Sequence, residues 1–353
     1  MTTSDSGVLT QAELQAFERM RALISDAREV ALSGHVSPDG DALGSELAMG
    51  WLVSQLNPQA RVTPLLAGDR AVPPRYAFLE GADRLTDGRD YDGIPDLFIG
   101  VDTPTPDRLK NARSALERAR HSVSVDHHVS MQEFADVNLL RESAASTGDI
   151  VYDFVRVLGL VPPAGVATCL LTAIITDTGR FQYQNTDTHA LRAASQLVEW
   201  GASPSLVSER IYQSYPLSLM RLRAQVLQRL SLDRSGRVAY SYVTQEDLRT
   251  FQLKPEDCDS LIDVVREVGG VDACVVLREG SAGTVRCNLR AKVDWLDVSD
   301  VASTFGGGGH RAAAGLTVVC SLEDAIGTVV GAVSRAVCSH PRRDGSVAGG
   351  PRR

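Results

Sequence analysis

Histidines and aspartates gather at four places along this sequence. The stretch HVSPDGD (residues 35–41) and the triplet DHH (126–128) hold three of each between them, and single aspartates lie in LFIGVD (97–102) and TDTG (176–179). Carboxylates mixed with neutral imidazoles suit Mn²⁺ and similar divalent cations, and two such cations about 3.5–4 Å apart are a recurring device for displacement at phosphorus. The residue types therefore indicate a two-metal site. The candidate ligands are His35, Asp39, Asp41, Asp102, His127 and Asp177.

The candidate ligands carry more negative charge than a buried site tolerates by itself. Four carboxylates and two neutral imidazoles cannot be buried together unpaired, whereas two divalent cations would balance the carboxylates. Asp177 gives a further reason, because it follows the apolar stretch 164–176, which predicts a buried helix. The negative end of that helix dipole would repel a carboxylate, and a nearby cation would remove the conflict.

Each aspartate also has a structural interpretation when it is taken alone. Asp41 could cap a helix that begins near Ala42, Asp39 with Gly40 could form a turn, and TDTG could be a surface turn. Acids and histidines at three strand ends favour one shared site over three separate turns.

Short apolar segments alternate with helix-like patterns in the first half of the chain. This alternation predicts an α/β fold with a mainly parallel sheet flanked by helices. Ligands of such sheets bind beyond the carboxyl ends of the strands, where the candidate ligands lie. The predicted strands are 28–34, 61–66, 96–102 and 121–126, and the predicted helices are 42–56, 106–119, 147–158, 164–176 and 188–200.

The pattern of predicted strands and helices changes after the stretch 204–232. This stretch looks helical and polar and is broken at SYP (214–216). The remainder predicts a second, smaller α/β domain, with a cleft between the two domains. Its predicted strands are 237–243, 271–278, 284–293 and 315–320, and its predicted helices are 258–268, 297–304 and 322–336. The predicted organisation is an N-terminal extension (1–21), a catalytic domain (22–202), a helical linker (203–232), a substrate-binding domain (233–337) and a disordered tail (338–353).

One predicted strand of the second domain has a cationic face. Arg286, Asn288 and Arg290 alternate with apolar residues along 284–293 and therefore share one face, although a solvated edge strand is the alternative. The glycines of FGGGGHR (305–311) allow backbone N–H groups to converge on an anion, and a plain glycine hairpin is the alternative there. The two features together predict a surface that binds phosphate.

Composition narrows the classes of function. The net charge of −8 and the pI near 5.4 argue against the broad basic surface that long duplex nucleic acid requires, but not against small phosphorylated ligands. The chain has no run of about 18 apolar residues, so no membrane span is expected. The polar N-terminus lacks the pattern of a signal peptide, which predicts a cytoplasmic protein. The six cysteines form no CxxC pair, so we expect mostly buried thiols and no structural zinc.

Five motifs in order resemble a known family. HVSPDGD, the VD at 101–102, DHH and TDTG are similar to the four motifs of the DHH phosphoesterase superfamily. GGGGHRAAAG (306–315) resembles the signature of its accessory domain, called DHHA1. The combination, over about residues 22–336, resembles the bifunctional oligoribonuclease and pAp phosphatase subgroup, where pAp is 3′-phosphoadenosine 5′-phosphate.

This resemblance implies two Mn²⁺ ions, with Mg²⁺ or Co²⁺ as alternatives, and a role for each matching residue. The implied assignment gives one ion His35 and Asp39, the other ion Asp41, His127 and Asp177, and both ions Asp102.

Outside the ligands, the resemblance implies that His128 stabilises charge on the scissile phosphate and that Asp126 orients the site. It also implies that the glycine run and the cationic strand hold the substrate. The implied substrate-binding residues are Arg286, Arg290, Gly306, Gly307, Gly308, Gly309, His310 and Arg311.

The implied substrates are RNAs of a few nucleotides, cleaved to 5′-mononucleotides, and pAp, converted to AMP. Linear or cyclic diadenylates are further candidates, and the resemblance also suggests a homodimer. Two alternatives stay open. A RecJ-type single-strand DNA 5′-exonuclease fits poorly with the acidity of the chain, and a non-catalytic nucleotide sensor should have lost ligands that are all present here.

Overall fold

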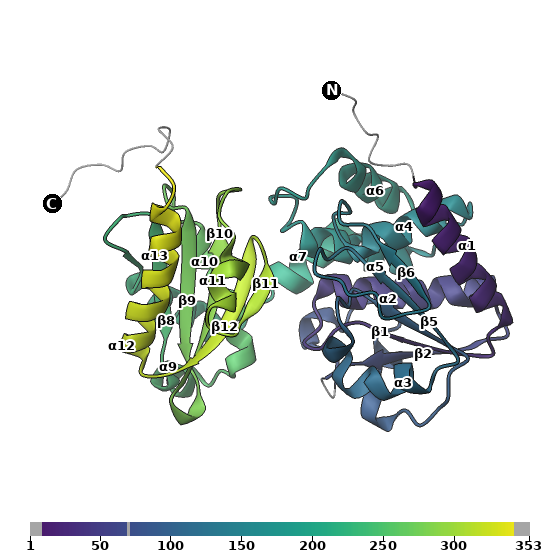
Figure 1. The fold of residues 1–353 in the computed structure, drawn as a ribbon, viewed down its shortest axis with the longest axis horizontal. Coiled ribbons are helices and arrows are strands. Elements are labelled where there is room, and N and C mark those ends of the chain that lie inside the picture. Colours follow the sequence, from purple (N-terminus) through teal and green to yellow (C-terminus); the bar gives the residue numbers. More distant parts are fainter. Residues whose placement is uncertain (1–8, 69–70, 342–353) are drawn as a thin grey trace. The chain divides into compact units, whose positions relative to one another are not determined.

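The computed structural model describes residues 9–68 and 71–341, and it omits the side chain of His310. The chain forms two compact units, which divide between Ser214 and Tyr215 (Figure 1). Each unit contains its own sheet and its own buried core, as an α/β chain with two domains requires. Among the described residues, no helix is long and apolar enough to cross a membrane.

The first unit is built on a six-stranded, fully parallel sheet. The strand order is β3-β2-β1-β4-β5-β6, so the chain first extends the sheet on one side of β1 and then crosses to the other. The boundary between β1 and β4 is therefore the topological switch point at which such sheets bind ligands. The strands are β1 (Glu29–Ser33), β2 (Arg61–Leu66), β3 (Thr86–Asp87), β4 (Leu97–Val101), β5 (His121–Asp126) and β6 (Val137–Leu140).

Apolar side chains from both faces of the central strands are buried, which explains their unbroken apolar runs. Val30 and Ile99 pack into the large core beneath the helices α2, α4 and α5, whereas Ala31 and Phe98 pack on the opposite face with the α3 segment. The helices of this unit are α1 (Gln11–Asp26), α2 (Gly40–Leu56), α3 (Arg113–Arg118), α4 (Thr147–Val157), α5 (Ala164–Asp177), α6 (Thr188–Glu199) and α7 (Pro204–Tyr212).

The expected helix 106–119 is only partly regular. Residues Pro106–Ala112 form a 3₁₀ helix that is kinked at Lys110, and α3 follows it. The other predicted strands and helices of this unit are confirmed with shifts of a few residues at their ends. The short strands β3 and β6 carry too few residues for the apolar pattern to mark them.

Helix α1 begins in the segment 1–21, which the sequence led us to expect as an N-terminal extension, and continues to Asp26. Thr10 caps it, accepting a hydrogen bond from the Glu13 amide while the Glu13 carboxylate accepts one from the Thr10 amide. Phe17 is fully buried and stacks on Phe154 of α4, with ring centroids 4.2 Å apart. The helix therefore belongs to the core of the first unit.

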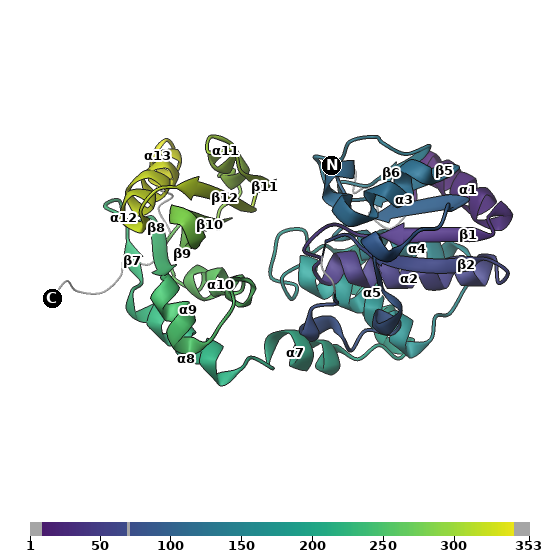
Figure 2. The same ribbon diagram turned by 90° about the horizontal axis from the view of Figure 1, so that it is seen from below.

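The second unit contains a six-stranded sheet of order β11-β12-β10-β9-β8-β7, antiparallel except between β8 and β9. Helices α12 and α13 lie on one side of this sheet, and α8 and α10 lie on the other (Figure 2). The strands are β7 (Ser231–Leu232), β8 (Val238–Val243), β9 (Ala273–Glu279), β10 (Thr284–Ala291), β11 (Gly308–His310) and β12 (Ala313–Val319). The helices are α8 (Leu217–Gln228), α9 (Gln245–Phe251), α10 (Leu261–Arg266), α11 (Val298–Ser303), α12 (Leu322–Ala325) and α13 (Gly331–Cys338), and a π-helical segment (Ile326–Val330) joins the last two.

The stretch expected as a helical linker is divided between the units. Val207 and Ile211 of α7 are buried in the core of the first unit, and Leu222 and Val226 of α8 are buried in the second. The break at 214–216 is the point at which the chain passes from one unit to the other.

The first residues of the expected tail (338–353) are part of the second unit. Helix α13 continues to Cys338, and His340 stacks on Trp295 with ring centroids 4.6 Å apart. The remaining tail residues, 342–353, lie outside the described residues. All six cysteines are free, and Cys169, Cys258, Cys274 and Cys287 are buried as expected.

Candidate metal centre

The sheet register of the first unit brings the sequence motifs together. Ser33 of β1 pairs with Gly100 of β4, so the residues two positions later, His35 and Asp102, emerge side by side. The Asp102 amide donates to the carbonyl of Val125, which places the DHH triplet beside them. Helix α2 starts directly after the first motif, and α5 ends on Asp177. All of these positions lie beyond the carboxyl ends of β1, β4 and β5.

The six expected ligands, together with His128, form three overlapping groups, in each of which one ligand atom per residue lies within 4.8 Å of the others. The Nε2 atom of His35 lies 3.5 Å from Asp102 Oδ2. The Nε2 atom of His127 lies 3.7 Å from Asp102 Oδ1. The two oxygens of Asp102 therefore face different histidines. The groups are His35–Asp39–Asp102, Asp41–His127–Asp177 and Asp102–His127–His128.

These distances fit metal coordination better than direct hydrogen bonding. His127 Nε2 lies 3.7 Å from Asp41 and 3.6 Å from Asp177, beyond the N–H···O limit of about 3.2 Å. Ligand atoms held about 2.1 Å from a tetrahedral cation lie about 3.4 Å from one another. The spacing of this donor set is therefore close to that of ligands around a divalent cation.

The histidine tautomers also fit a metal. His35 Nδ1 lies 2.9 Å from the carbonyl of Val36, and His127 Nδ1 lies 3.3 Å from the carbonyl of Ala144. A carbonyl only accepts, so Nδ1 carries a proton in both rings and Nε2 is the nitrogen that would bind a cation among the carboxylates. A backbone carbonyl behind a ligating imidazole is the usual arrangement that fixes a metal-binding histidine.

Without cations this cluster cannot stay fully ionised. Burial, reinforced by the Asp39 carboxylate, raises the pKa of Asp102 to about 7. Burial likewise raises the pKa of Asp177 to about 7, and burial with Asp102 raises the pKa of Asp41 well above its usual range. Burial by itself would lower the pKa of His127, but Asp177, Asp41 and Asp102 raise it to about 9. The site therefore favours added positive charge, either protons or metal cations.

The structure separates the roles that the sequence left open for Asp39 and Asp41. Asp39 is the N-cap of α2, because its Oδ1 accepts from the amides of Asp41 and Ala42, while its Oδ2 lies 3.9 Å from His35 Nε2. The carboxylate of Asp41 caps no turn of its own helix. It accepts instead from the amides of Thr147 and Gly148 at the start of α4. Capping and a place in the cluster are thus compatible for Asp39.

Asp126 holds the DHH segment in one conformation. Its Oδ1 accepts from the amides of His127 and His128 and from Nδ1 of the His128 ring, at 2.7–2.8 Å. Burial by itself would lower the pKa of His128, but the hydrogen bond to Asp126 raises it. This imidazole is therefore suited to stabilising negative charge beside the cluster.

Two residues that the sequence analysis missed contact the cluster directly. The hydroxyl of Thr147 donates to Asp102 Oδ1 at 3.1 Å, and the side-chain amide of Asn185 donates to the carbonyls of Asp177 and Ala145. The only sequence signal was the SAASTG stretch (143–148) before a predicted helix, which marks a helix start but says nothing about which aspartates it meets.

The residues expected to bind substrate lie in the second unit. Along β10, Val285, Cys287 and Leu289 are buried, whereas Arg286 and Arg290 lie on the other face, as the alternation predicted. The Arg286 guanidinium lies over Gly315 of β12, where a Cβ would come within 2.6 Å of it. Absence of a side chain at residue 315 thus lets this arginine lie along the sheet.

The glycine run forms a hairpin. Gly308 and Gly309 lie in β11 and pair with β12. The amides of Gly306 and Gly307 donate to carbonyls at the end of α11, so these two N–H groups are used within the protein. Arg311 donates to the carbonyl of Asp294, and the side chain of His310 lies outside the described residues.

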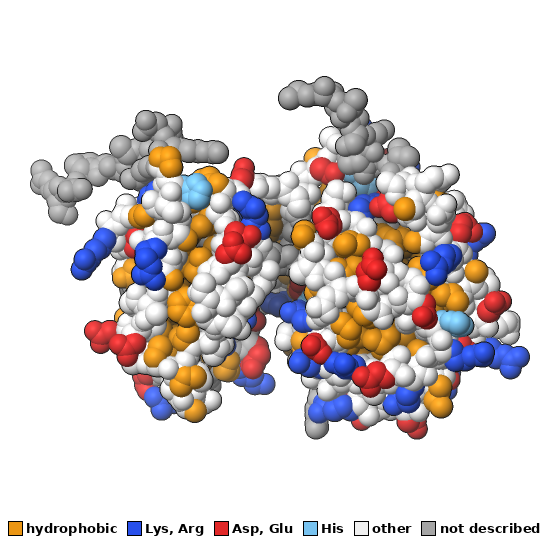
Figure 3. Space-filling view, viewed as in Figure 1, with side chains coloured by type: hydrophobic (Ala, Val, Ile, Leu, Met, Phe, Trp, Pro, Cys, Tyr) orange, Lys and Arg blue, Asp and Glu red, His pale blue; other side chains and the backbone are white. Residues whose placement is uncertain are grey.

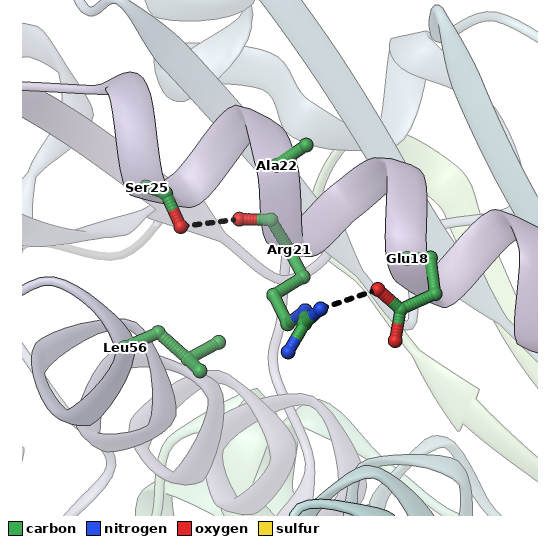
Figure 4. Close-up of a pocket in the computed structure, with 5 residues that line it drawn as sticks. All are labelled: Glu18, Arg21, Ala22, Ser25 and Leu56. Carbon is green, nitrogen blue, oxygen red and sulfur yellow. Dashed lines mark hydrogen bonds and ion pairs between the residues drawn. The ribbon is translucent and has the colours of Figure 1, made fainter.

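A separate cavity of about 310 Å³ lies between α1 and the end of α2 (Figure 4). Glu18 and Arg21 in its lining pair with each other at 2.7 Å, and both are about half exposed. The cavity contains no expected ligand. Its lining residues are Glu18, Arg21, Ala22, Ser25 and Leu56.

Each of the two units matches the model of a known protein family. Residues 29–174 match the family model described as DHH family, N-terminal domain, and residues 235–336 match the DHHA1 domain. The bifunctional oligoribonuclease and PAP phosphatase NrnA of Thermus thermophilus is 28% identical over 311 residues, which cover 87% of this chain and 90% of that protein.

Two further similarities extend the comparison. The cyclic-di-AMP phosphodiesterase GdpP of Geobacillus thermodenitrificans is 28% identical over 311 residues, which cover 82% of this chain but 45% of that protein. The crystal structure of an exopolyphosphatase-related protein from Bacteroides fragilis has the same fold, with a TM-score of 0.85 at 21% identity over 93% of this chain and 98% of that one.

Proposed function

Because this chain belongs to the DHH/DHHA1 phosphoesterase family, a family of metal-dependent hydrolases, we propose that it hydrolyses very short RNAs to 5′-mononucleotides and pAp to AMP. The observation that carries the proposal is Asp102, whose two carboxylate oxygens face the two histidines His35 and His127. We propose that two Mn²⁺ ions bind there, one held by His35 and Asp39 and the other by Asp41, His127 and Asp177, with Asp102 as a ligand of both.

Different residues of the chain have different roles in the proposed hydrolysis. Two bound divalent cations would supply an acidified water and neutralise charge at the phosphoryl group. Asp102 and its neighbours hold this charge in a fixed place. His128 is oriented by the hydrogen bond from its Nδ1 to Asp126, and its raised pKa favours a proton on Nε2 as well. Its Nε2–H donates a hydrogen bond to a phosphoryl oxygen and stabilises the charge that develops there.

We propose that the arginine face of β10 binds substrate phosphates. Arg286 and Arg290 share that face, and guanidinium groups bind phosphate oxygens in pairs. Because Gly306 and Gly307 use their amides internally, the arginine side chains are better candidates for this contact than the glycine backbone. A cyclic or linear diadenylate is a second candidate substrate, favoured by the similarity to a cyclic-di-AMP phosphodiesterase.

The surface charge supports short substrates over long ones. The chain carries a net charge of −8, and on the face drawn in Figure 3 acidic and basic side chains are interspersed without an extended basic area. A processive exonuclease gains affinity from each added phosphate on a basic track, and neither the net charge nor the face drawn in Figure 3 supports such a track.

The test is a set of initial rates with Mn²⁺ at fixed salt on RNAs from two to about twenty nucleotides, together with pAp and cyclic di-AMP in competition. We expect efficiency to fall as the RNA lengthens, because a longer chain adds charge without adding contacts. Equal or rising efficiency on the long RNAs would favour a RecJ-type exonuclease. Binding of nucleotides without any product would favour the sensor.

A further inference from the structure

A short segment that contains none of the expected ligands contacts two members of the group Asp41–His127–Asp177, called here the second ligand group. The segment Ala144–Gly148 lies between β6 and α4, and its backbone reaches both His127 and Asp41. The carbonyl of Ala144 accepts from His127 Nδ1 at 3.3 Å. The amides of Thr147 and Gly148 donate to the two oxygens of Asp41 at 2.7 and 2.9 Å.

Thr147 differs from its neighbours because it also contacts Asp102. Its amide holds Asp41, and its hydroxyl donates to Asp102 Oδ1 at 3.1 Å. A single residue thus joins the aspartate that faces both histidines to a ligand of the second group, through its side chain and its backbone respectively. The residue is fully buried, and the β-branched side chain restricts the direction of its hydroxyl.

The helix itself does not need this hydroxyl. Ser146 is the N-cap of α4, and its side chain accepts from the Asp149 amide. Thr147 is the first helical residue, where the amide would lack an intrahelical partner in any case and is satisfied by Asp41. The hydroxyl is therefore directed at the cluster and serves no cap.

The backbone of Asp102 suits its place at the centre of the cluster. Its φ of 53° lies in the left-handed region, which aspartate adopts more readily than most residues other than glycine and asparagine. The backbone leaves the rotation of the carboxylate open, and the Thr147 hydroxyl, bound to Oδ1, favours the orientation in which Oδ1 points toward His127 and Oδ2 toward His35.

We propose that Thr147 is a positioning residue of the metal centre, acting through Asp102 to set the geometry of both ligand groups. This inference rests on the proposed function only for the presence of the cations. It concerns Mn²⁺ binding by the chain and does not depend on which phosphate ester is hydrolysed.

The test compares Thr147→Val, which removes the hydroxyl at nearly constant volume, with Thr147→Ser, which keeps it. Calorimetric titration of the purified protein with Mn²⁺ is the readout, without substrate. Loss of a hydrogen bond to a ligating carboxylate commonly weakens metal affinity about 10- to 100-fold, and we expect that loss for Thr147→Val and an affinity near wild type for Thr147→Ser. Thr147→Ala, which cannot clash, repeats the test if the valine variant fails to fold.

Thr172→Val is the matched control. Thr172 is equally buried, and its hydroxyl donates to the carbonyl of Thr168 within α5. This variant should bind Mn²⁺ as the wild type does. Unchanged affinity in both Thr147→Val and Thr147→Ala, an equal loss in Thr147→Ser, or the same loss in Thr172→Val would overturn the inference. If the wild-type protein binds Mn²⁺ but cleaves none of the proposed substrates, the proposed function fails and this inference stands or falls by its own titration.

Discussion

At the scale of single residues, the centre depends on carboxylates that the folded protein holds against their own repulsion. Asp102 is almost completely buried and lies between the two histidines that define the groups. Its raised pKa shows that the protein alone opposes its negative charge. Bound cations would reverse this opposition, so metal binding and folding of the site are coupled.

We predict that Asp102→Ala abolishes Mn²⁺-dependent hydrolysis and leaves the fold intact. The substitution removes the oxygens shared by both groups but no apolar packing, since the lost side chain is a buried charge rather than a core hydrocarbon. Initial rates with Mn²⁺ and far-ultraviolet circular dichroism check the two halves of this prediction. Asp107→Ala, at an exposed position paired with Arg113, should keep full activity. A folded Asp102→Ala enzyme with wild-type turnover would refute the two-metal assignment.

At the scale of the elements, close packing of α2 against α5 brings Asp41 and Asp177 together. Gly44 of α2 makes this approach feasible, because a Cβ at that position would lie 2.3 Å from the carbonyl oxygen of Cys169 in α5. Gly50 lies on the same helix, where a Cβ would meet only Val62 at 3.7 Å. Substitutions at Gly44 and Gly50 therefore separate the effect of helix spacing from that of helix propensity.

We predict that Gly44→Ala lowers both thermal stability and Mn²⁺ affinity, because α2 must move away from α5 and carry Asp41 with it. Gly50→Ala should leave Mn²⁺ affinity unchanged and be neutral or stabilising by about 0.5–1 kcal/mol, as alanine favours a helix. Melting curves and Mn²⁺ titrations of both variants give the comparison. An equal change of Mn²⁺ affinity in the two would show that helix spacing does not control the site.

Glu46 connects α2 to the ends of two strands. Its oxygens accept from the amides of Gly34, after β1, and Leu65, in β2, both at 2.9 Å. Burial raises the pKa of this carboxyl from 4.5 to about 8 despite these two hydrogen bonds. Because the folded state favours the neutral acid, its contribution to stability is complete below pH 4.5 and is lost as the pH rises toward 8.

We predict that Glu46→Gln weakens the pH dependence of the free energy of unfolding between pH 4.5 and 8. An amide cannot ionise, but it keeps one acceptor for two amides, so the variant should lose about 1 kcal/mol at pH 5. The deficit should shrink or reverse at pH 8.5, where the wild type must ionise a buried group. Thermal midpoints at both pH values, measured with a chelator present, decide the matter. Parallel shifts at the two pH values would show that Glu46 does not titrate between them.

At the scale of the whole molecule, the two units carry different chemistry. The first contains the acids and histidines of the cluster, and the second has an arginine face on β10 without any of the expected ligands. This division suggests that metal binding and substrate capture can be altered separately.

We predict that Arg290→Ala lowers kcat/KM for a dinucleotide by roughly ten- to 150-fold, equivalent to ~1.5–3 kcal/mol for a charge-assisted contact. Mn²⁺ stoichiometry should not change. Bis-p-nitrophenyl phosphate has little for an arginine face to hold, so its hydrolysis should be much less affected. Arg249→Ala serves as the control, since Arg249 is exposed on α9 and pairs with Glu246. Equal losses on both substrates, or loss of bound Mn²⁺, would place Arg290 in the catalytic centre.

The sequence by itself determined the longer strands, most helices and the identity of the acids and histidines at the strand ends. These are local properties: apolar runs mark buried strands, and side chains that directly follow a parallel strand must emerge at one edge of the sheet. The alternation of Arg286 and Arg290 with Val285 and Leu289 was equally readable, because it follows from the two-residue period of a strand.

Tertiary structure decided what depends on residues far apart in the chain. The hydrogen bond from Thr147 to Asp41 spans 106 positions, and no local pattern says which helix start will meet which aspartate. The same contact showed that the Asp41 carboxylate anchors the start of α4, whereas Asp39 caps α2 through local bonds. The place of α1 in the core was settled by the stacking of Phe17 on Phe154. Sequence periodicity specifies which face of an element is buried, but the partner of that face is chosen by the packing of all the elements at once.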